Sequence, residues 1–162
     1  NQMSAAQGFS IGEGQGHYVN ALPPIDINVG AQTSDAWTMA KHSHASIILQ
    51  FGVVGAATTF TLEQATDASG TSAAAMAFSY YSETTAAGDT LSARTAATAS
   101  GVATGTTNNV TYIIELDAEE LTDGYTWLRV QLTDPGTATV AGVSAVLSGA
   151  RYAEVEGLTV IV

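Results

Sequence analysis

Two groups of side chains in this sequence could take part in chemistry, and the first is a run of carboxylates. Asp117, Glu119, Glu120 and Asp123 lie between two apolar runs. Carboxylates that face each other across a cleft can cleave glycosidic bonds, and clustered carboxylates can bind calcium. The spacing does not match an EF-hand loop, which needs ligands at fixed positions and a distal glutamate. The run is therefore interpreted as a solvated connection with a short helical cap.

The second group is the histidine pair His42 and His44. Residues two apart on a strand project from one face, so the pair could supply two ligands of a metal site, which oligomer symmetry would multiply. A pair without a nearby third ligand is more often an ordinary polar strand edge. We therefore expect no metal ligand and no cofactor, with metal binding by His42 and His44 kept as an open alternative.

Signals for other catalytic chemistry are weak. The chain has no cysteine, which excludes a thiol nucleophile, disulfides and thiolate-bound zinc. Its only lysine, Lys41, does not stand in a phosphate-binding Gly-x-x-x-x-Gly-Lys motif. An enzyme is not expected. A hydrolase that uses Glu115, Asp117 or Glu120 remains a third alternative.

The composition limits the partners. Four Lys and Arg stand against fifteen Asp and Glu, for a formal net charge of −11, which opposes binding to nucleic acid or to anionic lipid. We expect neither a signal peptide nor a membrane span, since the sequence shows no basic start followed by an apolar run and no apolar run of about 20 residues. The chain of 162 residues is expected to form one soluble domain.

The elements that must position these groups are strands. The stretch from Val110 to Pro135 contains two strand-like runs and is interpreted as a hairpin-like pair around the acidic connection. In its second run Leu128, Val130 and their alternate neighbours predict a core-facing side. The opposite side presents Tyr125, Trp127 and Arg129, residue types that are enriched in interfaces.

Further strands are predicted at 25–29, 46–54, 59–64, 74–82 and 139–147, the last of them central in its sheet. Short strands separated by turn signals indicate an all-β protein, an antiparallel β-sandwich of jelly-roll type. The glycine-rich residues 1–24 are predicted to form an extended N-terminal arm, with Phe9, Ile11 and Tyr18 as its anchors on a neighbouring subunit. Residues 25–150 are predicted to form the sandwich, and residues 151–162 a C-terminal strand or second arm.

Four segments resemble small structural proteins encoded among the head genes of tailed bacteriophages. They read AWTMAKHSHASIILQFG, TLEQATDASGT, YIIELDAEELTDGYTWLRVQLTDP and VSAVLSGARY. The resemblance runs from about Ser34 to Tyr152, and its motifs are structural rather than catalytic. It implies a capsid decoration (cement) protein that binds the major capsid protein across subunit boundaries, commonly as a homotrimer. The implied location is the capsid surface of the virion, after assembly in the host cytoplasm.

Exposed aromatic residues such as Trp127 also suit a carbohydrate platform. The alternative function is therefore a carbohydrate- or receptor-binding β-sandwich module of a phage appendage or a bacterial surface.

Overall fold

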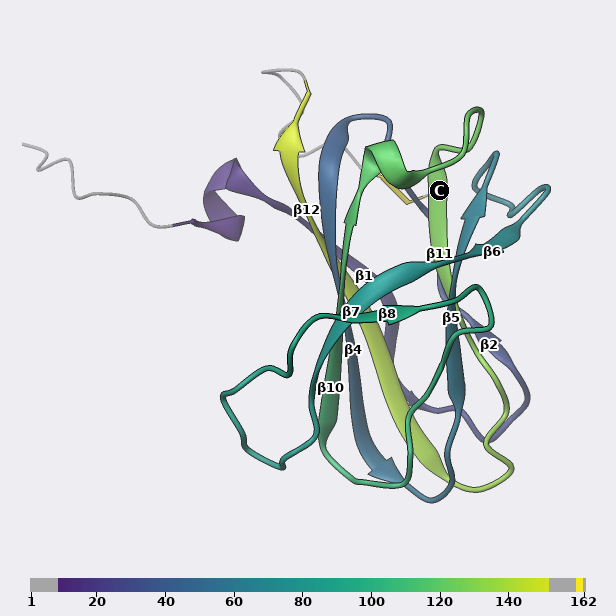
Figure 1. Ribbon diagram of the computed structural model, residues 1–162. Helices are drawn as coiled ribbons and strands as arrows, with labels where there is room; N and C mark the ends of the chain where they lie inside the picture. The colour runs from purple at the N-terminus through teal and green to yellow at the C-terminus, as the bar shows by residue number, and fades with distance from the viewer. Residues whose placement is uncertain (1–8, 152–159, 162) are drawn as a thin grey trace, which may run out of the picture.

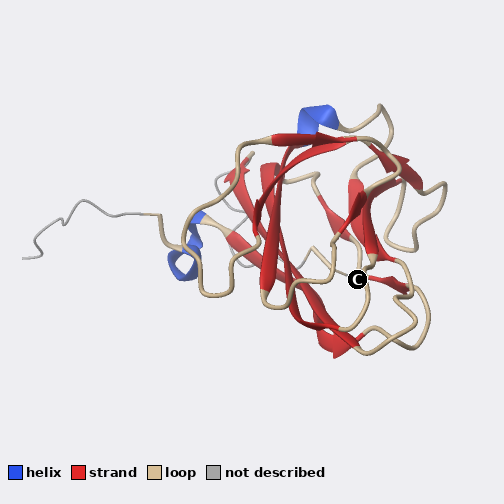
Figure 2. Cartoon of the chain, turned by 60° about the horizontal axis from the view of Figure 1, so that its bottom comes forward, coloured by secondary structure: helices blue, strands red, loops and turns tan. Residues whose placement is uncertain are grey.

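Two antiparallel β-sheets pack face to face in the computed structural model, which describes residues 9–151, 160 and 161. Figures 1 and 2 show that nearly all regular structure is strand. Among the described residues the two helical segments are single turns, η1 (Ile11–Gln15) and η2 (Ala118–Glu120). The predicted all-β sandwich is confirmed.

The first sheet, sheet A, contains the long strands. Its order is β1-β12-β4-β10-β7-β8. The strands are β1 (His17–Asp26), β12 (Thr139–Ala150), β4 (His42–Val54), β10 (Val110–Asp117), β7 (Phe78–Glu83) and β8 (Thr95–Ala97). The small-residue strand, predicted to be central, lies inside the sheet between β1 and β4, one strand from the edge.

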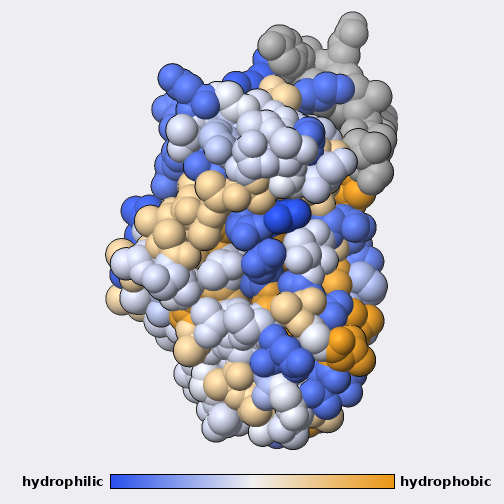
Figure 3. Space-filling model, turned by 90° about the vertical axis from the view of Figure 1, so that its right-hand side faces the viewer, coloured by the Kyte–Doolittle hydropathy of each residue, from blue (hydrophilic) through white to orange (hydrophobic). Residues whose placement is uncertain are grey.

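The second sheet, sheet B, has the order β2-β11-β5-β6, with two short strands added beside it. The strands on this path are β2 (Gln32–Thr33), β11 (Trp127–Leu132), β5 (Thr59–Ala65) and β6 (Ala74–Met76). The added strands are β3 (Trp37–Thr38), which pairs with β11, and β9 (Val102–Ala103), which pairs with β5. Figure 3 views the molecule from this side, where hydrophilic and apolar residues are interleaved.

Alternation along the strands builds the core between the sheets. On β4 every second residue from Ala45 to Phe51 is buried, and the residues between them are less buried or exposed. An aromatic cluster fills one end, where Phe60 lies 5.0 Å from Tyr112 and 6.0 Å from Phe78 between ring centroids. The Tyr112 hydroxyl donates to the Thr104 carbonyl oxygen at 2.9 Å. Trp37 is fully buried, so one of the two tryptophans belongs to the core.

The expected hairpin within Val110–Pro135 is corrected by the topology. β10 pairs with β4 and β7 in sheet A, whereas β11 pairs with β5, β2 and β3 in sheet B. The segment 118–126 therefore crosses from one layer to the other. Two alternating strands can bury their apolar sides as neighbours in one sheet or opposite each other across a sandwich. The alternation is the same in both cases, so the pattern alone does not distinguish them.

The sandwich starts at His17 and not at residue 25, because β1 takes in part of the expected arm. Pro23 and Pro24 lie inside β1, an edge strand of sheet A, where a missing N–H donor is tolerated. The register with β12 shifts between Asn20 and Leu22 and again between Leu22 and Ile25. The predicted arm thus shortens to the residues before β1, of which residues 1–8 lie outside the described part.

The expected C-terminal strand or arm falls largely outside the described residues. Val160 is 2% exposed and belongs to the core, and its carbonyl oxygen accepts a hydrogen bond from the Thr38 N–H at 3.1 Å. Val160 therefore packs beside β3 of sheet B. In the described ranges no helix is long and apolar enough to cross a membrane.

Candidate functional site

Three large apolar side chains are exposed around the start of β1, two in the segment before the strand and one on the strand itself. Phe9, Ile11 and Tyr18 are 63%, 41% and 55% exposed, and we call them the N-terminal apolar patch. Figure 1 shows η1 standing off from the sandwich at the start of β1. The Phe9 ring lies over Gly16, where an added Cβ would come within 2.8 Å of the ring. The three predicted anchors thus stand at one end of β1.

The second predicted group is divided by the structure. Trp127 and Arg129 lie on the outer side of β11 and are partly buried, while Leu128, Val130 and Leu132 are buried, as the alternation indicates. Tyr125 precedes the strand and lines a cleft. Their part in an interface stays a prediction.

Arg129 has a partner within the chain. Its Nε donates to Glu63 Oε2 at 2.7 Å, and the two side chains are 19% and 13% exposed. The turn at Gly70 closes over the guanidinium, so a Cβ at Gly70 would collide with it. Arg129 is thus held between β11, β5 and this turn, and the charge it could offer to another molecule is already neutralised.

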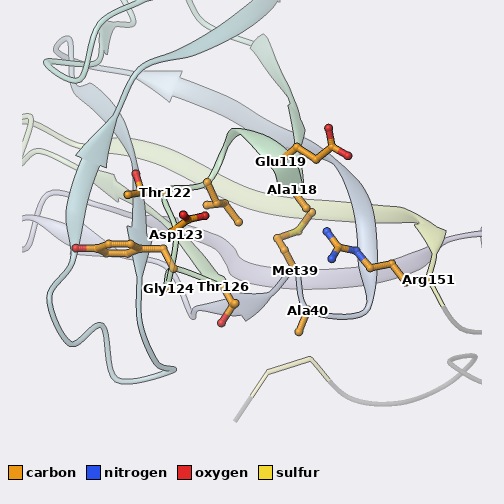
Figure 4. Close-up of a pocket in the computed structure, with 11 residues that line it drawn as sticks. Met39, Ala40, Ala118, Glu119, Thr122, Asp123, Gly124, Thr126 and Arg151 are labelled. Carbon is orange, nitrogen blue, oxygen red and sulfur yellow. The ribbon is translucent and has the colours of Figure 1, made fainter.

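A cleft of about 380 Å³ lies beside the acidic connection. Residues 118–126 form most of its wall, and Met39, Ala40 and Arg151 complete it. Figure 4 shows Met39 and Arg151 beside Ala118, with Thr122 and Asp123 on another side. The Asp117 N–H donates to Glu120 Oε1 at 3.0 Å, so the predicted short cap is present at the start of η2. The connection is both a solvated turn, as predicted, and the wall of a cleft.

His44 is clamped between two carboxylates of the neighbouring strand. Its Nε2 lies 2.7 Å from Glu115 Oε2, and its Nδ1 lies 2.7 Å from Asp117 Oδ1. Desolvation acts to lower the pKa of His44, but the hydrogen bonds and charges of Asp117 and Glu115 outweigh it, and the pKa is raised. The protonated ring can donate a hydrogen bond to each carboxylate, and these two bonds link the side chains of β4 and β10.

Ser46 joins the same group, because its hydroxyl donates to Glu115 Oε2 at 2.7 Å. The serine therefore bonds to a carboxylate and not to the imidazole, and the arrangement is not that of a serine activated by a histidine base. Sequence reasoning missed this group. Strand alternation places His44 and Ser46 on one side of β4, but only the register with β10 brings Glu115 and Asp117 opposite them.

His42 and His44 do not share partners. His42 is 4% exposed, and its ring centroid lies 5.9 Å from that of His17 on β1. Desolvation, followed by the charges of His17 and Lys41, lowers the pKa of His42. The expected histidine pair is thus split between a buried position and a carboxylate clamp. Within the described ranges no three or more His, Asp or Glu side chains are grouped so that they could hold a metal ion.

Ser10 stands in the letters Gly-Phe-Ser-Ile-Gly, which match the pattern of a nucleophile elbow. That elbow requires a strained turn between a strand and a helix. Ser10 has φ −123° and ψ 115°, which is ordinary extended backbone, so the match carries no chemistry.

Comparisons with known proteins do not indicate which of the surfaces described above is functional. No family model matches the chain, and no curated protein matches it. A solved structure, the crystal structure of SPBc2 prophage-derived protein YomS, is similar over 82% of this chain and 93% of that one, at 12% identity and a TM-score of 0.47.

Proposed function

We propose that the chain is a structural virion protein that binds the outer surface of a phage capsid and stabilises the shell across subunit boundaries. The observation that carries the proposal is the N-terminal apolar patch. Exposed large apolar side chains that project from a folded domain mark sites of contact with other proteins. The phage head resemblance of the four sequence segments supports the same class of function.

The sandwich suits such a role physically. A protein that binds only the assembled shell stabilises it by mass action, without any chemistry. Because β1 is hydrogen-bonded along β12, it gives the patch a fixed base, while the residues before His17 can reach a neighbouring subunit. The major capsid protein is the proposed partner, and a homotrimer is the proposed oligomer, with the capsid surface as the location.

The test is the binding of purified protein to undecorated capsids, measured by co-sedimentation. A variant that lacks the N-terminal segment should be truncated before Gly16. Deletion of residues 17–20 as well would remove part of β1. We expect stoichiometric binding by the full chain and weaker binding by the variant Phe9→Ser/Ile11→Ser. Leu91→Ser is the matched control, because Leu91 is an exposed apolar residue (47%) in a different loop. Equal losses in both variants, or none, would remove the patch from the proposal.

The cleft favours a second candidate, a carbohydrate-binding module. Its volume of about 380 Å³ lies in the range of small-ligand sites. Tyr125 offers a ring for stacking on a sugar, and Arg151, Asp123 and Thr122 offer groups that bond to hydroxyls. Binding on a saccharide array that is lost in Tyr125→Ala but kept in Phe9→Ser/Ile11→Ser would favour this candidate.

A further inference from the structure

The buried imidazole of His42, in sheet A, has a ring nitrogen whose polar group is not accounted for by a hydrogen bond among the described residues. His42 is 4% exposed, and its Nδ1 is buried with no hydrogen-bond partner among the residues that the structure describes. Buried polar atoms in folded proteins almost always have a partner, and an exception calls for an explanation such as a bound water or ion. His42 begins β4, where its N–H donates to the Met39 carbonyl oxygen at 3.3 Å.

His17 lies against this ring. The two ring centroids are 5.9 Å apart with the planes tilted by 40°. The residues come from different strands, since His17 pairs with Leu147 of β12 and His42 pairs with Ala150 of the same strand. Two imidazoles from β1 and β4 therefore meet near the end of β12 that lies between them.

The separation fits two ligands of one metal ion. With zinc about 2.0–2.1 Å from each coordinating nitrogen, the centroids of two imidazoles lie roughly 5–6 Å apart, depending on the angle at the metal. Imidazole binds metals as the neutral ring, and the low exposure of His42 disfavours the charged form.

We propose that His17 and His42 form a two-histidine site for a borderline transition-metal dication, Zn²⁺ or Cu²⁺, which joins the start of β1 to β4. Imidazole ligands suit these ions, whereas Mg²⁺ and Ca²⁺ require oxygen ligands. Water or a group from another molecule completes the coordination. His44 is not a member, because both of its ring nitrogens are bonded to carboxylates.

A metal ion at this site would restrict the position of the N-terminal segment. His17 follows Gly16 at the beginning of β1, next to the N-terminal apolar patch. A bridge from His17 to the inner strand β4 would fix the point from which that segment leaves the sheet. This inference does not depend on capsid binding, since metal binding at this site can be measured directly on the isolated protein.

The test is titration of the purified full chain, free of any polyhistidine tag, with Zn²⁺ by calorimetry. We expect one equivalent per chain, and a melting temperature that rises with Zn²⁺ because the ion binds only the folded state. His17→Gln should weaken binding by about tenfold or more through the loss of one of two protein ligands. His17 is the first choice for substitution because it is only partly buried, so the variant should fold.

Two further variants make the result specific. His44→Ala is the matched control and should keep the affinity of the unchanged chain. Lys41→Gln should tighten binding, because Lys41 precedes His42 in the chain and its positive charge repels a cation bound there. Bound Cu²⁺ should show nitrogen hyperfine coupling in its electron paramagnetic resonance spectrum, and this coupling should change in His17→Gln. Absence of Zn²⁺ binding, or equal loss in His17→Gln and His44→Ala, would overturn the proposal.

Discussion

The Arg129 guanidinium and the Glu63 carboxylate form an ion pair across β11 and β5, with Nε and Oε2 2.7 Å apart and both side chains mostly buried. Of the residues that the sequence placed on an outer contact surface, this arginine has its charge satisfied within the chain. Its first role is therefore to hold sheet B together and to support the turn at Gly70.

Arg129→Ala should lower the free energy of unfolding by about 1–3 kcal/mol, because Glu63 is left partly buried without its charged donor. Denaturant unfolding monitored by circular dichroism measures the loss. Arg94→Ala is the control, since Arg94 is exposed and forms no ion pair within the described residues. A loss no larger than that of Arg94→Ala would show that the pair contributes nothing to stability.

His44→Ala should lower the free energy of unfolding by about 1–2 kcal/mol near neutral pH. The substitution leaves Glu115 and Asp117 without the ring that bonds to both, and hydrogen bonds to charged groups are among the stronger ones. Gln50→Ala, an exposed position on the same strand, is the control. If the two variants unfold at the same denaturant concentration, the clamp is dispensable.

Gly101→Ala should cost more stability than Gly136→Ala, although both glycines have positive φ, +82° and +69°. Each alanine would carry backbone strain of about 1–2 kcal/mol. At Gly101 the new Cβ would also collide with the Phe60 carbonyl oxygen, whereas nothing lies within 4 Å at Gly136. Thermal melts of the two variants separate strain from collision, and equal melting temperatures would contradict this account.

The loop after β7 should loosen in acid. Glu83 accepts hydrogen bonds from the N–H groups of Thr85 at 2.7 Å and Thr90 at 2.9 Å, which lower its pKa from the ordinary value of 4.5. A carboxyl whose pKa is lower in the folded state stabilises that state above its unfolded pKa, and the contribution is lost as the pH falls through the folded pKa.

The amide resonances of Thr85 and Thr90 should therefore titrate together in nuclear magnetic resonance spectra, with a midpoint below 4.5. In Glu83→Gln this shared transition should disappear. Separate midpoints for the two amides in the unchanged chain would mean that one carboxylate does not organise the loop.

Alternation made most of the fold predictable. The buried and exposed sides of β4 and β11 follow directly from Ile47, Leu49, Leu128 and Val130 and their neighbours, because a half-buried strand repeats every two residues. The start of β1 was not predictable in the same way. Its edge position tolerates two prolines, which from the sequence indicate a boundary.

The candidate sites depended on pairings that a single sequence does not contain. His44 meets Glu115 and Asp117 through the register of β4 with β10. His17 meets His42 because β12 brings two strands together that are not paired with each other. Residue types therefore identified which side chains could do chemistry, while their partners came only from the topology.

The place of β12 between β1 and β4 also bears on how the chain folds during synthesis. Sheet A cannot close until residues 139–150 have left the ribosome, although β1 and β4 were made long before. Such long-range pairing is slow, and it leaves apolar strand faces uncovered in the meantime. We therefore expect fragments that end before β12 to aggregate or to bind chaperones, and folding to complete in one late step.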